Sequence, residues 1–247
     1  MSGHSKWTNI KRKKGKADAE RGHLFTKFAR EIAVAVKAGG PNIDGNFQLK
    51  NIVAKAKAAN IPNDNIMRAI KNAAGSDSAN YDSKVYEGYG IGGIAVIVEC
   101  LTDNANRTAG DVRHIFDKCG GNMGASGCVS FMFNRQGVLL IDSANVKDEE
   151  ELMMQALDAG AEDFQLEEDM YEITTDPDSF DTVREALSNA GYEFESAEVA
   201  MVPSTYTALT DPEQIAKMEK MLDMFDENDD VQNVYHNWDM PEVEDED

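Results

Sequence analysis

The first sixteen residues carry the strongest chemical signal in the sequence. Six lysine or arginine residues and no acidic residue lie there, on both sides of Trp7. Cationic side chains neutralise phosphates, and an aromatic ring beside them can stack on an unpaired base. We therefore predict that Gly3 to Lys16 is an extended arm that binds nucleic acid. A solvated, disordered tail is the alternative for such a charge run.

The predicted contacts continue from this arm into the segment that follows it. Further cations stand there on a predicted helix. The complete predicted set of nucleic-acid-binding residues is His4, Ser5, Lys6, Trp7, Lys11, Arg12, Lys13, Lys14, Lys16, Arg21, Lys27 and Arg30.

Two glycine-rich segments resemble phosphate-binding motifs but stand in the wrong context. Gly88 to Gly93 matches the GxGxxG pattern, which must open a helix, whereas a strand is predicted directly after it. We expect a turn or bulge at the entry to a sheet. The segment 120–127 lacks the Lys-Ser/Thr ending of a nucleotide-binding loop and also precedes a predicted strand, so we expect a flexible loop.

This loop and the helix predicted before it offer secondary contacts to a partner. Met123 is expected at the loop tip, where a methionine is an adaptable contact. On the helix, Arg107 could face a ligand, whereas Arg113 could instead only balance Asp111 or Asp117, and the sequence does not decide between these roles. The predicted secondary contacts are Arg107, Asn122 and Met123.

The sequence offers no pattern for catalysis or for metal binding. The three cysteines show no CxxC spacing, and the four histidines have no ligand spacing. The segment 226–230 begins like a calcium loop, but Val231 replaces the required glycine and Asn237 the required glutamate. A solvated helix end explains these acids better. We predict a protein without enzymatic activity, cofactor, metal or small-molecule substrate.

Charge divides the chain of 247 residues into two parts. The net charge is −21, yet residues 1–75 carry +10 and residues 76–247 carry −31. No stretch of about 20 apolar residues could span a membrane, and no apolar segment follows the first lysines as in a secretory signal. We expect a cytoplasmic protein without a membrane partner.

The basic part has the periodicity of a small helical bundle. Apolar residues recur at intervals of three and four in 16–37, 46–59 and 63–74, which predicts three amphipathic helices. Four cations fall off the apolar stripes and are expected on the surface: Lys50, Lys57, Arg68 and Lys71.

Beyond residue 82 the pattern changes to short β-branched runs that alternate with helices. Strand 94–100, helix 104–118 and strand 128–133 come first, and a complete β-α-β-β-α-β series follows over 138–201, the order of a ferredoxin-like fold. Strand 205–209, helix 212–225 and strand 231–235 would complete the first half.

These patterns predict an α+β multidomain protein, a three-helix bundle followed by two ferredoxin-like α/β sandwiches, one inserted in the other. The expected domains are a basic helical domain with its arm (1–75), a split α/β domain (82–134 plus 205–240), an inserted α/β domain (135–204) and an acidic tail (241–247).

Several short segments closely resemble the YebC/PmpR family over nearly the whole chain. They are Met1 to Trp7, Lys27 to Glu31, Asn60-Ile61, Tyr86 to Gly90, Asn104 to Thr108 and Gly120 to Asn122. The resemblance implies a helical domain followed by two α/β domains, and a cytosolic regulator of gene expression. Family members are described as probable DNA-binding transcriptional regulators. Others look like ribosome-associated factors that help translation through proline-rich stretches, and mitochondrial relatives activate translation of a cytochrome oxidase subunit.

The residues and the family resemblance together leave three functions open. The first is DNA-linked transcription control, which is the usual family description, although no helix-turn-helix pair is recognisable. An extended basic arm with one aromatic suits irregular RNA, such as ribosomal RNA, at least as well. A remainder of charge −31 would also be repelled from long duplexes. In the third reading, the acidic domains form a protein interaction module that the arm tethers.

Overall fold

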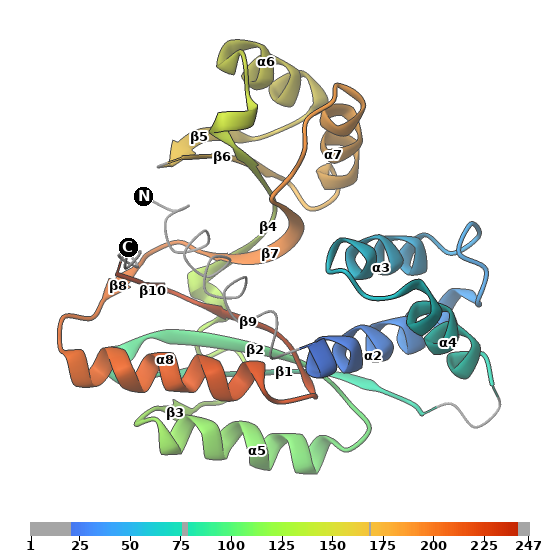
Figure 1. Ribbon diagram of the computed structural model, residues 1–247. Helices are drawn as coiled ribbons and strands as arrows, with labels where there is room; N and C mark the ends of the chain where they lie inside the picture. Colours follow the sequence, from blue (N-terminus) through green and yellow to red (C-terminus); the bar gives the residue numbers. More distant parts are fainter. Residues whose placement is uncertain (1–20, 76–78, 168, 242–247) are drawn as a thin grey trace. The chain divides into compact units, whose positions relative to one another are not determined.

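The computed structural model describes residues 21–75, 79–167 and 169–241 (Figure 1). These residues form two compact units. The first, here called the bundle–sheet unit, contains residues 21–129 and 210–234. The second, called the insert unit, contains residues 130–209 and 235–241. No helix within the described ranges is long and apolar enough to cross a membrane.

Three helices form the first part of the bundle–sheet unit: α2 (Arg21–Gly39), α3 (Phe47–Ala58) and α4 (Asn63–Ala73). Their apolar stripes meet in one core that includes Ile32, Leu49 and Ile66, each at most 1% exposed. Asn46 caps α3, because its side chain accepts a hydrogen bond from Leu49 N and donates to two carbonyls at the end of α2. The three helices predicted from hydrophobic spacing are confirmed.

A four-stranded sheet completes this unit. Its strands are β1 (Asp82–Tyr89), β2 (Ala95–Thr102), β3 (Asn122–Met123) and β9 (Val231–His236), in the order β3-β1-β2-β9. Helices α5 (Ala105–Lys118) and α8 (Pro212–Asp226) lie side by side (Figure 1). The rings of Phe116 and Phe225 pack edge to face between them, with ring centroids 5.5 Å apart.

The sequence missed one strand of this sheet, and two of its other predictions are wrong. Residues 82–89 form β1, which the sequence pattern left unassigned, because their polar residues lack the alternation of a half-buried strand. The strand predicted over 128–133 is absent from 128–132, because a 3-10 turn, η2 (Ser130–Met132), lies there, and Phe133 is already the first residue of β4 (Phe133–Asp142). Residues 205–209 do not join the sheet, because the short β8 (Thr207–Ala208) pairs instead with β10 (Trp238–Asp239).

The GxGxxG segment forms the turn that the sequence predicted. Gly88 and Tyr89 end β1, and a 3-10 turn, η1 (Ile91–Gly93), leads into β2. Gly92 and Gly93 have φ values of 68° and 80°, which other residues rarely adopt. The segment therefore joins two antiparallel strands and opens no helix.

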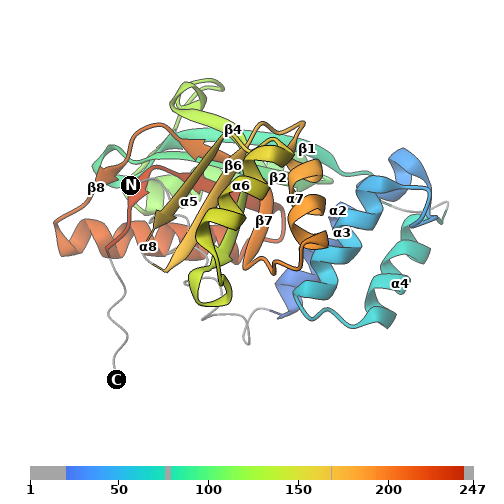
Figure 2. The ribbon, with the colours of Figure 1, turned by 90° about the horizontal axis from the view of Figure 1, so that it is seen from above.

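The insert unit contains the predicted β-α-β-β-α-β series. Its elements are β4 (Phe133–Asp142), η3 (Ser143–Asn145), α6 (Glu149–Ala159), β5 (Asp163–Glu167), β6 (Met170–Thr175), α7 (Phe180–Asn189) and β7 (Ser196–Pro203). The order β5-β6-β4-β7, with every neighbour antiparallel, is that of a ferredoxin-like sheet. Figure 2 shows α6 and α7 on the same face of this sheet. The predicted fold class is confirmed.

Candidate nucleic-acid interface

Most of the predicted nucleic-acid contacts lie outside the described residues. They are His4, Ser5, Lys6, Trp7, Lys11, Arg12, Lys13, Lys14 and Lys16. Arg21 is the first residue of α2. The role of these residues stays a prediction.

The surface of the helical bundle carries exposed cations. Lys50, Lys57, Arg68 and Lys71 are all exposed, as predicted from their place off the apolar stripes. Lys55 is exposed as well. Residues 21–75 contain nine basic and three acidic residues, so a polyanion that contacts this part of the protein meets an excess of positive charge.

Two apolar side chains stand among these cations, and sequence reasoning missed them. Phe47 is 58% exposed and lies three residues before Lys50 on α3; Met67 is 53% exposed and lies four residues before Lys71 on α4. Residues three or four apart are neighbours on a helix surface. An exposed ring beside a cation can stack on a base while the cation holds a phosphate. The sequence did contain a signal for the exposure of Phe47, because this residue lies on the side of the predicted helix opposite the apolar stripe.

Arg30 occupies a different place from the one predicted. Its side chain is only 12% exposed and its guanidinium forms an ion pair with Asp230. It also donates a hydrogen bond of 2.7 Å to the Leu101 carbonyl and lies over the ring of Tyr81. Lys27 is half-buried on the same helix. We therefore assign Arg30 a contact inside the bundle–sheet unit, because its guanidinium is turned away from solvent.

The carboxylate of Asp230 is the centre of a polar network in this unit. Thr108 Oγ1 donates to it over 2.6 Å, and Arg107 Nη2 lies 2.9 Å from Oδ2. Thr102 Oγ1 lies 3.3 Å from the same oxygen. Together with Arg30, these residues connect α2, β2, α5 and the start of β9. The network fixes the helical bundle to the sheet.

Burial alone would raise the pKa of Asp230, but hydrogen bonds from Thr108, Arg30 and Arg107 outweigh it and lower the pKa to about 2. The side chain is 5% exposed, so the expectation of a solvated helix end is wrong for this residue. In a run of four acids and one asparagine, nothing in the residue types distinguishes the buried member.

Arg107 combines an internal and an exposed role. Its side chain is 46% exposed and pairs with Asp103, four residues earlier, as well as with Asp230. The sequence suggested a ligand contact for this arginine and acid pairing only for Arg113. Its pairing with two carboxylates accounts for its position without a ligand.

The loop at 120–129 is held in place by Glu87, a buried residue of β1. The backbone amides of Gly127 and Val129 donate to its carboxylate over 2.8 and 2.9 Å. The amide of Gly124 donates to its carbonyl. At Gly88 a β-carbon would lie 2.5 Å from the Asn122 carbonyl oxygen, so β1 and β3 approach too closely for any side chain. These contacts restrain the loop that the sequence predicted to be flexible.

The predicted secondary contacts on β3 differ in exposure. Asn122 is exposed, whereas Met123 is half-buried. Both lie on the edge strand beside β1. Asn122 is thus the better placed of the two for a partner.

The cysteine thiols are poor nucleophiles in this environment. Burial, reinforced by Asp230, raises the pKa of Cys100 to about 12, and burial also raises the pKa of Cys119 and Cys128. In the described ranges, no three or more histidine, cysteine, aspartate or glutamate side chains gather as a metal site.

The fold defines a class of protein in which a helical bundle with a basic surface is combined with two sheets that carry helices. Residues 5–76 match the family model described as the TACO1/YebC protein N-terminal domain. Residues 81–238 match the model of the TACO1/YebC second and third domain. The chain belongs to the TACO1/YebC family.

Individual relatives match over nearly their full length. A protein of Acetivibrio thermocellus named "Probable transcriptional regulatory protein" is 61% identical over 96% of this chain and 99% of its own. One of Ruminiclostridium cellulolyticum with the same name is 59% identical over the whole of both chains. The crystal structure of the conserved hypothetical protein Aq1575 from Aquifex aeolicus is 43% identical, with a TM-score of 0.81 over 94% of this chain and 96% of that one.

Proposed function

We propose that this protein is a non-enzymatic, nucleic-acid-binding regulator of gene expression that acts in the cytoplasm through its basic amino-terminal region. The observation that carries the proposal is the excess of exposed cations on the helical bundle, which continues the positive charge of the arm. The names of the relatives, probable transcriptional regulatory proteins, agree with a regulatory role.

In the proposed complex, cations hold phosphates and aromatic rings hold bases. The arm supplies six cations and Trp7, together with Arg21 and Lys27 on α2. The bundle adds Lys50, Lys57 and the exposed ring of Phe47. Phosphate contacts of this kind provide affinity without reading sequence. Acidic residues elsewhere in the chain repel a long duplex and confine contact to the basic region.

Duplex DNA is the first candidate target, because the relatives are named probable transcriptional regulatory proteins. The second candidate is a factor that binds ribosomal RNA and relieves stalled translation at proline-rich sequences. The exposed Phe47 beside Lys50 favours this candidate, because unpaired bases that can stack are common in folded RNA and absent from an intact duplex.

The proposal is tested by neutralising the bundle cations in the full chain. The variant K50Q/K57Q/R68Q/K71Q is compared with R113Q/K118Q/K147Q/K220Q, which removes four exposed cations outside the bundle. Mobility-shift titrations over a salt series use duplex DNA, single-stranded DNA and a structured RNA. We expect the bundle variant to bind more weakly. Its log-log salt slope should fall by about 0.9 for each duplex phosphate that it no longer neutralises, or by about 0.7 on single strands.

Equal behaviour of the two variants would exclude the bundle as a contact surface. Weaker binding of the structured RNA than of duplex DNA would exclude the ribosomal candidate. The phenylalanine contact has its own comparison: F47A should weaken binding to single strands about five-fold or more and leave duplex binding unchanged.

A further inference from the structure

The two edge strands of the insert sheet differ in exposure. Among the strands that the structure describes, the order β5-β6-β4-β7 places β5 at one edge and β7 at the other. Every residue of β7 is buried or half-buried, whereas three of the five residues of β5 are exposed: Asp163, Gln165 and Leu166. An edge strand presents backbone N–H and C=O groups to which a further strand can add. The edge at β5 is therefore the accessible one.

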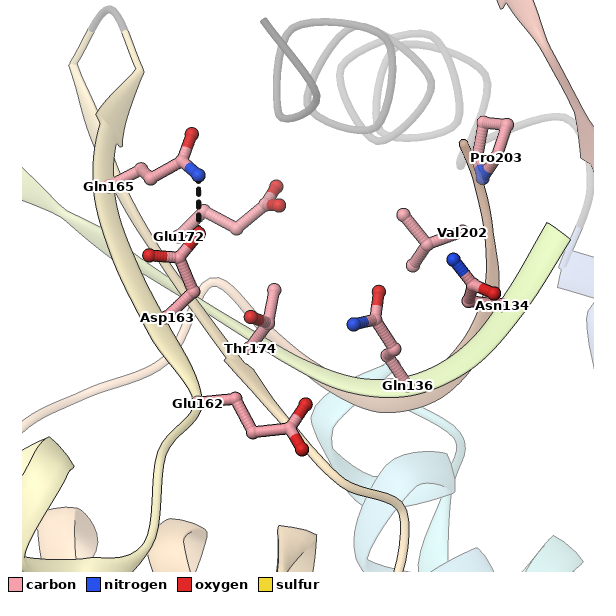
Figure 3. A pocket seen from close by; sticks show the side chains of 9 residues that line it. All are labelled: Asn134, Gln136, Glu162, Asp163, Gln165, Glu172, Thr174, Val202 and Pro203. Atoms are coloured by element: carbon pink, nitrogen blue, oxygen red, sulfur yellow. Dashed lines mark hydrogen bonds between the residues drawn. The ribbon is translucent and has the colours of Figure 1, made fainter. Parts of the chain in front are cut away.

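The backbone amide of Phe164 on β5 uses a local acceptor. It donates over 2.9 Å to the carboxylate of Asp163, the residue before it. The same carboxylate accepts a hydrogen bond from the Gln165 side chain (Figure 3). The carbonyl of an added strand can replace the carboxylate as the acceptor for Phe164. This exchange would turn the Asp163 carboxylate towards a cation of the added strand.

Exposed apolar side chains lie near this edge on the side of the sheet that carries α6 and α7. Leu166 pairs with Tyr171, which belongs to the core beneath these helices, so both residues stand on the same side. Leu166 is nevertheless 50% exposed. On α6, Met154 and Leu157 are 60% and 47% exposed, and residues three apart are neighbours on a helix surface.

The packing of α6 brings its apolar residues to the side of β5. Helix α6 contacts β5, whereas α7 contacts β4 and β7. The hydroxyl of Tyr171 donates over 3.2 Å to Glu149 in the first turn of α6. Met153 and Leu157 follow Glu149 at intervals of four residues, so they continue the same flank of the helix. This flank and Leu166 together form an apolar strip along the edge of the sheet.

The surroundings of this strip are acidic throughout. No lysine or arginine lies between Lys147 and Arg184, whereas fourteen acidic residues do. On α6, Glu150 and Asp158 stand one turn before and one turn after Met154, and both are exposed. A polypeptide that covers the strip therefore meets carboxylates on its border, and lysine or arginine side chains complement them.

On the opposite side of the sheet, a pocket of about 210 Å³ opens beside β5. Figure 3 shows Glu162, Asp163 and Gln165 along one wall of this pocket. All three are exposed. Side chains directly opposite each other on neighbouring strands have β-carbons about 5 Å apart. A lysine or arginine on a strand added to β5 would thus reach the carboxylates of Glu162 and Asp163.

A second copy of the chain does not fit this edge. If two β5 strands paired antiparallel about Gln165, Asp163 of each copy would lie opposite Glu167 of the other. Like charges directly opposite each other destabilise a strand pair. Charged side chains often protect an edge strand from pairing, but charges of a single sign leave it open to a strand of the opposite sign.

We propose that β5 binds an extended, basic segment of a partner protein, which adds to the insert sheet as a fifth strand. Successive residues of a strand point to opposite sides, so the segment has apolar residues that alternate with lysine or arginine. Its apolar side chains pack on Leu166, Leu157 and Met154, and its cations meet Glu162 and Asp163. The site uses residues of the insert unit alone and does not depend on the nucleic-acid function proposed above.

Two peptides titrated calorimetrically into the full chain test this proposal. The first has seven residues of alternating lysine and valine, and the second has the same composition with four lysines before three valines. We expect the first to bind about ten-fold more tightly, because only the alternating peptide places its valines on one side of a strand and its lysines on the other. Equal affinities would mean charge attraction alone and would overturn strand addition.

Hydrogen exchange of the full chain locates the bound peptide. We expect the amides of Phe164 and Leu166 to exchange about ten-fold more slowly with the alternating peptide bound, because they gain carbonyl partners on it. Slower exchange on β7 or on the helices with no change on β5 would contradict the proposed site.

A matched pair of substitutions tests the apolar strip. L166S and V85S each remove an exposed apolar side chain from a strand, one 50% and the other 49% exposed. We expect L166S to weaken binding of the alternating peptide about five-fold and V85S to change it by less than about two-fold. Equal weakening would exclude a specific role of Leu166. Self-association of the free chain that L166S abolishes, measured by sedimentation equilibrium, would assign the edge to a second copy and overturn the proposal.

A second pair tests the acids. E162Q/D163N removes two exposed carboxylates beside β5, and E185Q/E193Q removes two exposed ones on α7 and after it. We expect the first variant to weaken binding of the alternating peptide about three-fold or more at low salt and the second by less than about two-fold. Equal losses would show only the effect of net charge and would refute recognition at this edge.

Discussion

The helical bundle and the insert unit are both built around an apolar core, but their surfaces carry opposite net charge. Each buries one apolar core of small size, around Leu49 in the bundle and Leu139 in the insert. Residues 21–75 contain nine basic and three acidic residues, whereas residues 130–209 contain three basic and nineteen acidic ones. Mixed charges would keep either domain soluble with less self-repulsion. Neither fold requires this separation of charge, which agrees with the binding function proposed above.

The largest effect is expected where the basic bundle is attached to the sheet. Replacing Asp230 by alanine leaves Arg30 buried without its carboxylate, which we expect to cost about 3 to 5 kcal/mol in the free energy of unfolding. Urea denaturation measures this change. The neighbouring D229N, at an exposed residue that pairs with His23, should stay within about 0.5 kcal/mol of wild type. Similar values for both variants would show that the bundle does not depend on the network.

A substitution in the insert tests whether the two units unfold separately. A β-carbon at Gly137 would lie 2.2 Å from Thr175 Oγ1 and 2.7 Å from Phe180 Cδ2. Overpacking of this kind costs about 1 to 3 kcal/mol, so G137A should lower the melting transition of the insert unit. Calorimetry that finds a single transition shifted as a whole would show one cooperative unit.

The pH dependence of stability should also separate the units. The lowered pKa of Asp230 means that its stabilisation is complete above the ordinary value of 3.8 and is lost as pH falls towards about 2. We expect unfolding titrations between about pH 5 and 2 to show this loss in the bundle–sheet unit, and D230N to lack it. An unchanged pH profile in D230N would assign the acid sensitivity to other carboxylates.

The smallest expected effect is a gain in the stability of the bundle–sheet unit. Gly110 lies inside α5, and a β-carbon there would meet no atom within 4 Å. Alanine favours a helix over glycine by about 0.5 to 1 kcal/mol, so G110A should raise the melting temperature of this unit and leave that of the insert unchanged. A decrease would mean that the position needs the freedom of glycine.

The hydrophobic pattern predicted those helices and strands whose apolar residues follow a regular order along the sequence. The bundle helices each have one apolar stripe, and β4 contains the continuous apolar run Val138–Ile141, so these patterns located them. The strand β1 has polar residues at its start and only a two-residue neighbour on one side, so its alternation is weak. Short pairings such as β8 with β10 depend on distant residues and leave no local pattern.

The site was predicted less completely than the fold. Positions off the apolar stripes correctly placed Lys50 and Lys71 on the surface. Spacing could not show that Arg30 meets Asp230, because two hundred residues separate them. The buried Asp230 and the exposed Phe47 both contradict what their residue types favour. Their environments come from tertiary packing, which a single sequence does not display.

The pairing of Phe133 with Pro203 has a consequence for the order of folding. These residues stand at the start of β4 and the end of β7, so the folded insert brings its two ends within about 5 Å of each other. Once folded, the insert of some 70 residues therefore connects the chain segments before and after it over a distance as short as that of a tight turn. Because closing a long loop costs more entropy than closing a short one, we expect the insert to fold first and to speed the joining of α8 and β9 to the sheet that precedes it.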